Sequence, residues 1–398
     1  MSASRTPRSP GRGRPPADER RRDLRRRRRN ALLILLVGVI VIVGFVVWAG
    51  RGGDGSAGDG ATTTPAPVLQ VVARSPQPQL PAPAKPALAV TATGGDGLEM
   101  RVVAAPAGKP VVPGRWLPAA KSLSLPGNIT ALLEAGSIPG YVEIRDDSGR
   151  TTRSTTLLLP PTPGTGTAEV IRSVATTRPY VALVFDDGLD ESGVERIIEV
   201  LRRTKSGGTF CLNGVNVTTW PASLAKKVQA AVADGIITMC SHGWSHRTST
   251  SSTEAEALSD LTANASTDRY LGVASVPFYR PPYGALSPGI EAAAGKLGYR
   301  WIVMWDVDPS DYEKPDAATL VSRIVSASGK GSIVVLHAIN ATADALPGVI
   351  KGLAGKGLKA VTLTTLFGTA AADRAASTTA TTPATTGGEV ETAAGEAP

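Results

Sequence analysis

Histidine and aromatic residues are scarce in this chain of 398 residues. Aromatic residues make up 5% of the sequence, whereas there are 43 glycines and 31 prolines, which indicates that much of the chain is not packed core. The three histidines are His242, His246 and His337. Because neutral imidazole is a strong zinc ligand, a chain so poor in histidine that places two of them four residues apart is predicted to build a metal site.

Basic residues are in excess only at the start of the chain. The formal net charge of +8 comes from residues 1–30, which hold twelve arginines and three acidic residues, so the rest of the chain is slightly acidic. This distribution argues against a globular surface that binds nucleic acid. Membrane topology and attraction to anionic lipids account for the arginines, and a dedicated nucleic-acid-binding arm is the alternative.

The one long apolar run lies at residues 31–49, which read ALLILLVGVIVIVGFVVWA and contain no charge. A helix of about 20 apolar residues spans a bilayer. Because the arginines precede this run, we predict a cytoplasmic tail at 1–30, a transmembrane anchor at 31–49 and an extracytoplasmic remainder in the cell membrane. A cleaved signal peptide is the alternative, although its apolar region is usually shorter and no convincing cleavage site precedes Gly50.

Beyond the anchor, the composition divides the chain further. Residues 50–86 are rich in glycine, threonine, alanine and proline, which predicts a linker. Residues 87–165 are predicted to be a small β-rich region of unknown role, with strand-like segments at Leu88–Thr93, Leu98–Ala104, Tyr141–Arg145 and Thr151–Leu159. Residues 370–398 are predicted to be a disordered tail.

Between residues 178 and 368, strand-like and helix-like segments alternate. The strand-like segments are Val181–Phe185, Gly208–Leu212, Ile236–Cys240, Trp301–Trp305, Ser332–Leu336 and Leu358–Leu363. The helix-like segments are Glu191–Arg203, Pro221–Ala233, Glu254–Leu271, Ser287–Leu297, Ala317–Ser326 and Leu346–Ala354. This α/β pattern predicts a parallel sheet covered by helices, most simply a β/α barrel, and about 190 residues is small for the full eightfold form.

The two cysteines, Cys211 and Cys240, both fall on predicted strands. An even number of cysteines outside the cytoplasm permits a disulfide. Two small buried hydrophobic residues are the alternative, and the sequence alone does not decide between them.

Ionisable residues follow several of the predicted strands, where functional groups gather in parallel α/β folds. They are Asp186 and Asp187, then His242 and His246, then Arg280 within Arg280–Gly284, then Asp306, Asp308 and Asp311, and finally His337. Each group alone is explained by an ordinary turn or a satisfied side chain. Their recurrence at five strand ends predicts a single functional site.

These segments also carry a resemblance. Val184–Gly188, Ser241–His246, Arg280–Gly284, Asp308–Tyr312 and Leu336–His337 occur in order and resemble the five motifs of the polysaccharide deacetylase family, the NodB-homology domain of carbohydrate esterase family four. Thr209–Gly214 is similar to the second strand of that family. The resemblance covers residues 178–368 and implies a distorted (β/α) barrel with fewer than eight strands.

The resemblance implies a role for each matching residue. Asp186 matches the general base, and Asp187, His242 and His246 match the ligands of a divalent metal, which we expect to be Zn²⁺. Arg280 matches the arginine that holds the base, His337 the general acid, Asp311 its carboxylate partner and Asp308 a supporting acid. Tyr283, Pro282 and Tyr312 match positions that contact the substrate.

Three positions depart from the family pattern. Tyr312 stands where tryptophan is usual, which preserves an aromatic wall. Gly243 replaces a common serine or threonine and loses a local hydrogen bond, and Ala338 replaces a frequent acid beside His337. None of these changes removes a predicted ligand or proton carrier, so we expect an active enzyme.

The sequence therefore predicts a membrane-anchored, metal-dependent hydrolase that removes N-acetyl groups from a cell-wall or surface polysaccharide, with N-acetylglucosamine of peptidoglycan as the first candidate. An O-acetyl polysaccharide esterase is one alternative, because the same centre suits ester cleavage. A non-catalytic glycan-binding membrane protein, in which residues 87–165 carry the function, is the other. No nucleic-acid partner is expected.

Overall fold

The structure is a computed structural model that describes residues 68–380, except 79, 84, 86 and 107–108. The described residues belong to one compact unit, Ala66–Pro398. Within the described part, no helix is long and apolar enough to cross a membrane. The predicted tail at 1–30 and anchor at 31–49 lie outside the described residues.

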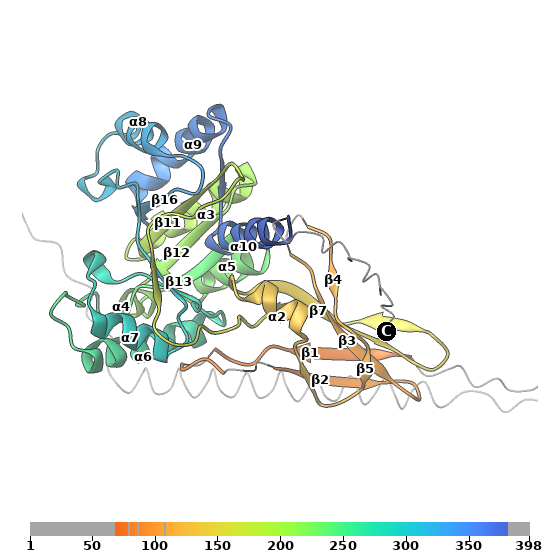
Figure 1. Cartoon of the computed structure of the whole chain (residues 1–398). Coiled ribbons are helices and arrows are strands. Elements are labelled where there is room, and N and C mark those ends of the chain that lie inside the picture. Colours follow the sequence, from red (N-terminus) through yellow and green to blue (C-terminus); the bar gives the residue numbers. More distant parts are fainter. Residues whose placement is uncertain (1–67, 79, 84, 86, 107–108, 381–398) are drawn as a thin grey trace, which may run out of the picture. The chain divides into compact units, whose positions relative to one another are not determined.

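The first described part of the chain is built of two antiparallel sheets (Figure 1). One sheet has the order β1 (Gln70–Arg74), β2 (Ala87–Thr93) and β6 (Ser122–Ser124). The other has the order β4 (Val112–Pro113), β3 (Glu99–Ala104), β7 (Ile138–Arg145) and β8 (Thr151–Arg153), while β5 (Leu117–Pro118) pairs with β3 and β9 (Leu157–Leu159) pairs with β7. A short helix, α2 (Gly127–Leu133), accompanies them.

This β-rich region has a hydrophobic core of its own. Strand β7 alternates strictly between buried and half-buried residues, so that Val142 and Ile144 point inward. They belong to one cluster with Met100 of β3, Leu88 of β2 and Ile129 of α2. The alternating apolar residues from which strands were predicted here therefore lie on the face of the strand that packs into this core.

The predicted linker at 50–86 is wrong at its C-terminal end. Residues Gln70–Arg74 form β1, which pairs antiparallel with β2 from Gln70↔Thr93 to Arg74↔Ala89. The strand is short and alternating, and Ala73 is buried. Its signal was hidden because proline-rich sequence follows it, and because its pairing partner lies beyond that proline-rich stretch.

The second part is a mixed α/β region around a parallel sheet of eight strands. The strands are β10 (Glu169–Ile171), β11 (Tyr180–Asp187), β12 (Gly208–Leu212), β13 (Ile237–Ser241), β14 (Phe278–Tyr279), β15 (Trp301–Val303), β16 (Ile333–His337) and β17 (Lys359–Val361). The order is β10-β15-β14-β13-β12-β11-β16, with β17 also pairing with β11.

The sheet curls back toward itself as a half-barrel. Isolated bridges join Ser173, just after β10, to Ser332, and Val307, after β15, to Val334 of β16. The edge that starts with β10 is thereby brought against the edge that ends with β16. The catalytic region predicted to begin at 178 thus gains β10, which pairs in parallel with β15.

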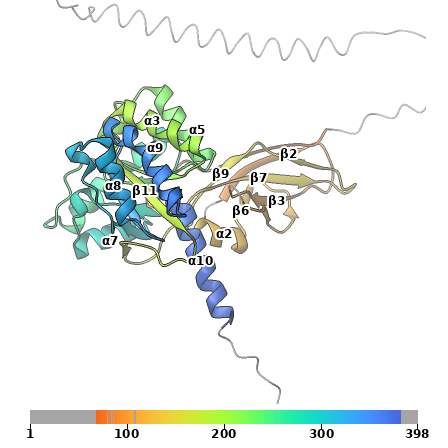
Figure 2. The same cartoon turned by 90° about the horizontal axis from the view of Figure 1, so that it is seen from above.

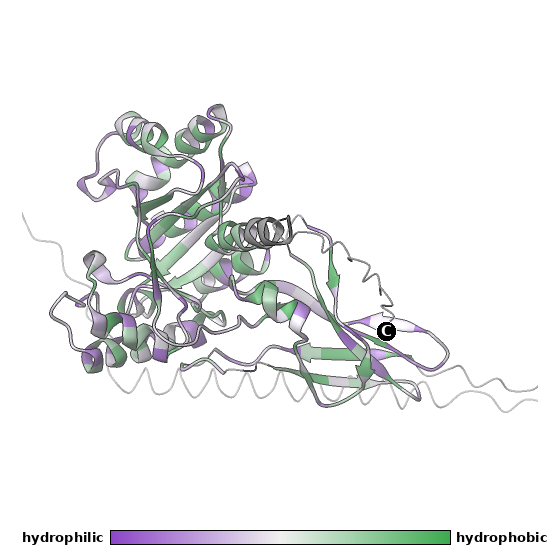
Figure 3. Ribbon diagram, in the orientation of Figure 1, coloured by the Kyte–Doolittle hydropathy of each residue, from purple (hydrophilic) through white to green (hydrophobic). Residues whose placement is uncertain are grey.

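Helices cover the outside of the sheet, as Figure 1 shows. They are α3 (Glu191–Thr204), α4 (Gly214–Val217), α5 (Ala222–Ala233), α6 (Glu254–Leu271), α7 (Pro288–Lys296), α8 (Ala317–Ala327), α9 (Asn340–Gly355) and α10 (Leu363–Ala380). Two single turns of 3₁₀ helix, η1 (Pro282–Gly284) and η2 (Asp311–Glu313), follow β14 and β15. Because both faces of the sheet are covered, β12 and β13 are buried at every residue and the strands appear as apolar bands in Figure 3.

Two helices extend beyond their predicted limits. Helix α9 begins at Asn340 rather than Leu346, because Asp190 from the β11–α3 connection accepts hydrogen bonds from the backbone and side-chain nitrogens of Asn340 (3.0 and 2.8 Å). That contact spans 150 residues of sequence, so local periodicity could not reveal it.

Helix α10 overturns the predicted disordered tail as far as Ala380. Leu363, Leu366, Phe367 and Ala370 recur at helical spacing and are buried. The hydroxyl of Thr362 accepts a hydrogen bond from the backbone N–H of Thr365 at the start of the helix (3.1 Å). Figure 2 shows the later turns of α10 projecting beyond the rest of the described chain.

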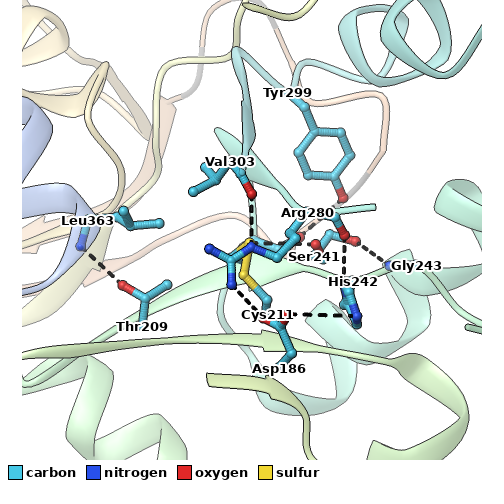
Figure 4. The surroundings of a disulfide bond; sticks show 12 residues. Asp186, Thr209, Cys211, Ser241, His242, Gly243, Arg280, Tyr299, Val303 and Leu363 are labelled. Carbon is cyan, nitrogen blue, oxygen red and sulfur yellow. Dashed lines mark hydrogen bonds and ion pairs between the residues drawn. A yellow bond between two sulfur atoms is a disulfide. The ribbon is translucent and has the colours of Figure 1, made fainter. Parts of the chain in front are cut away.

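Cys211 and Cys240 form a disulfide between β12 and β13, which resolves the alternative that the sequence left open. The two residues are direct register partners in the parallel pair, with 4.3 Å between their Cα atoms. Asp186, on β11, is in turn the register partner of Cys211, on β12 (Figure 4). The disulfide therefore lies directly behind the ends of the strands that carry the predicted site.

Because the chain has two cysteines, denatured and unreduced protein should expose no free thiol to a thiol reagent, and reduced protein should expose two. A variant with Cys211→Ala and Cys240→Ala should lose about 3 kcal/mol of unfolding free energy in denaturant titrations, since the bond closes a loop of sequence separation 29. Two thiols in the unreduced protein would contradict the pairing.

Candidate active site

The predicted site residues lie at the C-terminal ends of the parallel strands. Asp186 and Asp187 end β11, His242 and His246 follow β13, Arg280 follows β14, Asp311 opens η2 after β15, and His337 ends β16. Asp186 of β11 and His337 of β16 are register partners, so the first and the last predicted site residues in the sequence lie next to each other. One edge of the sheet thus gathers groups that span about 150 residues of sequence.

Three of these residues form a cluster suited to a metal ion. Oδ1 of Asp187 lies 3.5 Å from Nε2 of His242 and 3.4 Å from Nε2 of His246. All three potential ligand atoms lie within 4.8 Å of one another. Asp187 Oδ1 is buried and has no hydrogen-bond partner, which leaves a carboxylate oxygen free for a cation. One carboxylate and two imidazoles form a donor set that fits zinc, with a fourth position open.

The tautomer of His242 is fixed by its backbone contact. Its Nδ1 lies 2.7 Å from the carbonyl oxygen of Arg280, which can only accept, so Nδ1 carries the proton and Nε2 presents a lone pair. Burial lowers the pKa of His242 to about 3, so the ring is neutral at physiological pH. A neutral, oriented imidazole is the form that a metal ion requires.

The loop that holds the two histidines is shaped by positive φ angles and by one carboxylate. Gly243 has φ +73° and His246 has φ +55°. Asp260 of α6 accepts hydrogen bonds from the backbone N–H groups of Trp244 and Ser245 (2.8 and 3.0 Å) and from the Ser245 hydroxyl. A Cβ at position 243 would lie 2.3 Å from Oδ2 of Asp260. Glycine is therefore required here, and the predicted loss of a local hydrogen bond is offset by these contacts.

Asp186 and Arg280 form a buried ion pair (Figure 4). Nη1 of Arg280 donates to Oδ1 of Asp186 at 3.0 Å, and the arginine side chain is fully buried. Its other nitrogens donate to the backbone carbonyls of Val303 (2.8 Å) and Met304 (3.2 Å). Burial raises the pKa of Asp186 above its usual range, and the guanidinium opposes that rise. A carboxylate with a raised pKa is a stronger base than an ordinary aspartate.

His337, the register partner of Asp186, is held by Asp311. Its Nδ1 lies 2.7 Å from Oδ1 of Asp311, while Oδ2 accepts from the His337 backbone N–H (2.7 Å) and from the Thr342 hydroxyl (2.5 Å). Burial disfavours the charged ring, but the hydrogen bond to Asp311 and the charges of Asp311, Asp186 and Asp187 outweigh it and raise the pKa of His337 to about 9. The ring is therefore protonated at neutral pH.

The three residues predicted to contact substrate differ in exposure. Tyr283 is 77% exposed and its hydroxyl lies 3.1 Å from Nδ1 of His246. Tyr312 is 56% exposed and meets the ring of His337 edge-on, with 5.8 Å between centroids. Pro282 is buried within η1 and shapes the turn that presents Tyr283. The aromatic wall expected from Tyr312 is thus in place.

Two aspartates near the site accept hydrogen bonds that stabilise nearby backbone segments instead. Asp308 is exposed and accepts a hydrogen bond from the Ser310 N–H (2.9 Å), as in an ordinary turn. Asp306 accepts from the Ser332 hydroxyl and the Ile333 N–H (2.8 and 2.7 Å), which secures β16. Ala338, where an acid is frequent, donates its N–H to the backbone carbonyl of Asp186 (3.0 Å).

The sequence reasoning missed several residues that support the site. Asn213 donates from its side chain to the carbonyl of His242 (2.6 Å), and Asn216 donates to the carbonyl of Asp187 (3.2 Å). Asn264 donates to the hydroxyl of Ser241 at the start of the histidine loop (2.8 Å). Together with Asp260 and Thr342, these residues join elements distant in sequence, and no local pattern marks them.

Residues 173–302 match the family model described as polysaccharide deacetylase. The chain carries a domain of the polysaccharide deacetylase family. The match contains Asp186, Asp187, His242, His246 and Arg280, and Asp311 and His337 follow it.

Curated relatives align over a longer stretch. The chain is 28% identical over 195 residues to the peptidoglycan-N-acetylmuramic acid deacetylase PdaC of Bacillus subtilis, an alignment that covers 49% of this chain and 40% of that one. It is also 28% identical over 197 residues to the peptidoglycan-N-acetylglucosamine deacetylase PgdA of Listeria monocytogenes, again with 49% and 40% covered. The chain thus matches less than half the length of these two polysaccharide deacetylases.

Among solved structures, the B. subtilis peptidoglycan deacetylase PdaC is similar with a TM-score of 0.44 and 27% identity, covering 52% of this chain and 98% of that one.

Asp187→Ala should weaken binding of zinc by more than about a hundredfold, because even changes behind a metal ligand commonly cost 10- to 100-fold. Isothermal titration of metal-stripped protein measures the affinity. Asp308→Ala is the matched control, since Asp308 is an exposed aspartate of a nearby loop whose hydrogen bond within the described residues is to the Ser310 backbone N–H. Equal zinc affinity in the two variants would rule out Asp187 as a ligand.

Proposed function

We propose that this chain is a metal-dependent hydrolase that removes N-acetyl groups from a cell-wall polysaccharide and releases acetate. The observation that carries the proposal is that the Asp187–His242–His246 cluster lies beside a buried carboxylate, Asp186, whose register partner on the next strand is the protonated His337. A metal site flanked by one base and one acid is what amide hydrolysis requires. The names of the relatives, which act on peptidoglycan, favour that glycan as the substrate.

A divalent ion held by Asp187, His242 and His246, which we propose to be zinc, would supply a water of lowered pKa and polarise the acetyl carbonyl. Asp186 takes the proton of the attacking water, and Arg280 holds its carboxylate in place. The backbone N–H of Tyr283 is proposed to stabilise the oxyanion that develops on the acetyl oxygen.

His337 completes the reaction on the leaving-group side. An amine leaves poorly unless its nitrogen is protonated, and the imidazolium of His337 can deliver that proton from Nε2 while Asp311 holds Nδ1. This arrangement favours cleavage of an N-acetyl group over an O-acetyl group, because an alkoxide depends less on the acid. The products are acetate and a free amine on the sugar.

We propose that the half-barrel is the distorted (β/α) barrel of the deacetylase type, and that residues 1–30 and 31–49 anchor it in the cell membrane from the cytoplasmic side. The catalytic region would then work outside the cytoplasm. The disulfide agrees with such a location, because disulfides persist in oxidising surroundings.

Acetate release should depend on metal. Protein stripped with a chelator is expected to release no acetate from peptidoglycan or N-acetylglucosamine oligomers, and added zinc should restore release, because the metal supplies the activated water. Acetate is measured enzymatically in both states. If the metal-loaded protein cleaves only O-acetylated glycan and keeps most of its rate after His337→Ala, the activity is ester cleavage rather than N-deacetylation.

The rate should fall as the pH rises through the pKa of His337, about 9, because only the protonated ring can act as the acid. Asp311→Asn removes the negative partner that raises this pKa, so the alkaline limb of kcat should move toward the ordinary imidazole value of about 6.5. Rates across a pH series measure the shift, with Asp308→Asn as control. An unmoved limb in Asp311→Asn would exclude His337 as the acid.

A further inference from the structure

A cavity lies on the flank of the histidine loop, and none of the proposed metal ligands, base or acid lines it. Its volume is about 530 Å³. Its walls combine the loop with one side of α6: Trp244, Ser245, Arg247, Thr248, Ser249, Ser251, Ser252, Glu256, Ala257, Ser259, Asp260 and Ala263. Hydroxyl groups dominate these walls, and an aromatic ring and a guanidinium join them, which is a lining suited to a sugar.

The two acidic residues of this cavity are already engaged by the protein. Asp260 accepts three hydrogen bonds from Trp244 and Ser245, as described above. Glu256 accepts from the backbone N–H and the hydroxyl of Thr253 (2.8 and 2.9 Å) in the capping box of α6. Both carboxylates therefore stabilise the loop and the helix start, and their hydrogen-bonding capacity is directed there.

Arg247 is in the opposite situation. It is exposed, it directly follows the proposed metal ligand His246, and it makes no ion pair or side-chain hydrogen bond with any residue that the structure describes. Two arginines of the α/β region that do have carboxylate partners are Arg196, with Asp344, and Arg202, with Asp234. A guanidinium left unpaired beside a reaction centre is available to bind a carboxylate through paired hydrogen bonds.

Trp244 gives the cavity a fixed wall. Its ring lies against the backbone of Gly214, where a Cβ would come within 2.1 Å of the indole. The residue is half-buried, and Asp260 holds its backbone N–H. The cavity is thus bounded by a positioned ring rather than by a loop that is free to close.

We propose that this cavity is a substrate subsite in which Arg247 binds a carboxylate carried by the glycan, on or next to the sugar that loses its acetyl group. The inference rests on the proposed deacetylase function and adds a preference for acidic over neutral N-acetylated glycans. The cavity adjoins the proposed metal ligands along the chain, since Trp244 and Ser245 lie between His242 and His246 and Arg247 directly follows His246. Carboxylate capture there would position the neighbouring acetyl group over the metal cluster.

Arg247→Gln tests the proposal in the zinc-loaded protein. Acetate release is compared on phosphate-free peptidoglycan fragments with free carboxylates, on the same fragments after carboxyl methylation, and on neutral N-acetylglucosamine oligomers. The variant should lose about tenfold or more in kcat/KM on the free-carboxylate fragments, mainly through KM, and less than about twofold on the other two substrates, because a charge-assisted hydrogen bond is lost only there. Arg247→Lys, which keeps the charge but not the paired donors, should fall between.

Arg203→Gln is the matched control. It removes the same charge from the last turn of α3, an exposed position at the far end of a helix that leads away from the site. Equal losses in Arg203→Gln and Arg247→Gln, or an equal loss on neutral and acidic substrates, would overturn the subsite. So would a loss that appears only on glycan carrying phosphate.

A binding measurement separates this proposal from the proposed activity. Calorimetry on the Asp186→Asn protein, with and without Arg247→Gln, gives the affinities for free-carboxylate and methylated fragments without turnover. A preference for the free carboxylate that disappears with Arg247→Gln supports the subsite even if no acetate is ever released. A preference that persists, or is absent from the start, overturns it even if deacetylation is confirmed.

Discussion

The buried ion pair between Arg280 and Asp186 is the interaction on which the geometry of the site depends. The guanidinium donates to Asp186 on β11 and to the carbonyls of Val303 and Met304 at the end of β15. The backbone of Arg280 binds Ser241 through its N–H and His242 through its carbonyl. One residue therefore ties together three strand ends. A charge buried so completely is costly unless it is paired, so the pair holds only while all three strands keep their places.

The two consecutive aspartates illustrate how environment divides chemical roles. Asp186 is buried against Arg280, whereas Asp187 is partly exposed and turns its Oδ1 toward the two histidines without any hydrogen-bond partner. The backbone of Asp187 has φ +74°, a strained conformation for a residue other than glycine. That turn ends β11 and separates the proposed base, Asp186, from the proposed metal ligand, Asp187. Two neighbouring side chains of the same type are thus suited to two different roles.

The strand and helix periodicity of residues 178–368 predicted most of the α/β region, because buried parallel strands and amphipathic helices leave a direct trace in sequence. It failed where a long-range contact defined the element: Asp190 starts α9 early, and β1 depends on pairing with β2. The candidate site residues could be proposed from the sequence because each follows a strand-like segment and falls within a motif of the family that the chain resembles. Their supports, such as Asn213 and Asp260, were not found, because a polar residue in a loop or on a helix gives no sign of which distant backbone it binds. The pairing of Cys211 with Cys240 likewise required the register of β12 and β13.

That register explains why a cross-link at this place is effective. Asp186, Cys211 and Cys240 are successive partners across β11, β12 and β13, and His242 follows two residues after Cys240. Only β12 therefore separates β11, which carries the proposed base, from β13, which leads to the proposed metal ligands. Strand β12 is bonded covalently to β13 through the disulfide and to β11 through the hydrogen bonds of the sheet. A sub-ångström shift of β13 would change the distance between Asp187 and His242, on which cation binding depends. The disulfide restricts that shift from within the sheet, while Arg280 restricts it from the side of β14. The proposed metal-binding cluster is thus held from two directions by bonds that belong to the scaffold, and Asp260, Asn213 and Asn264 hold the histidine loop.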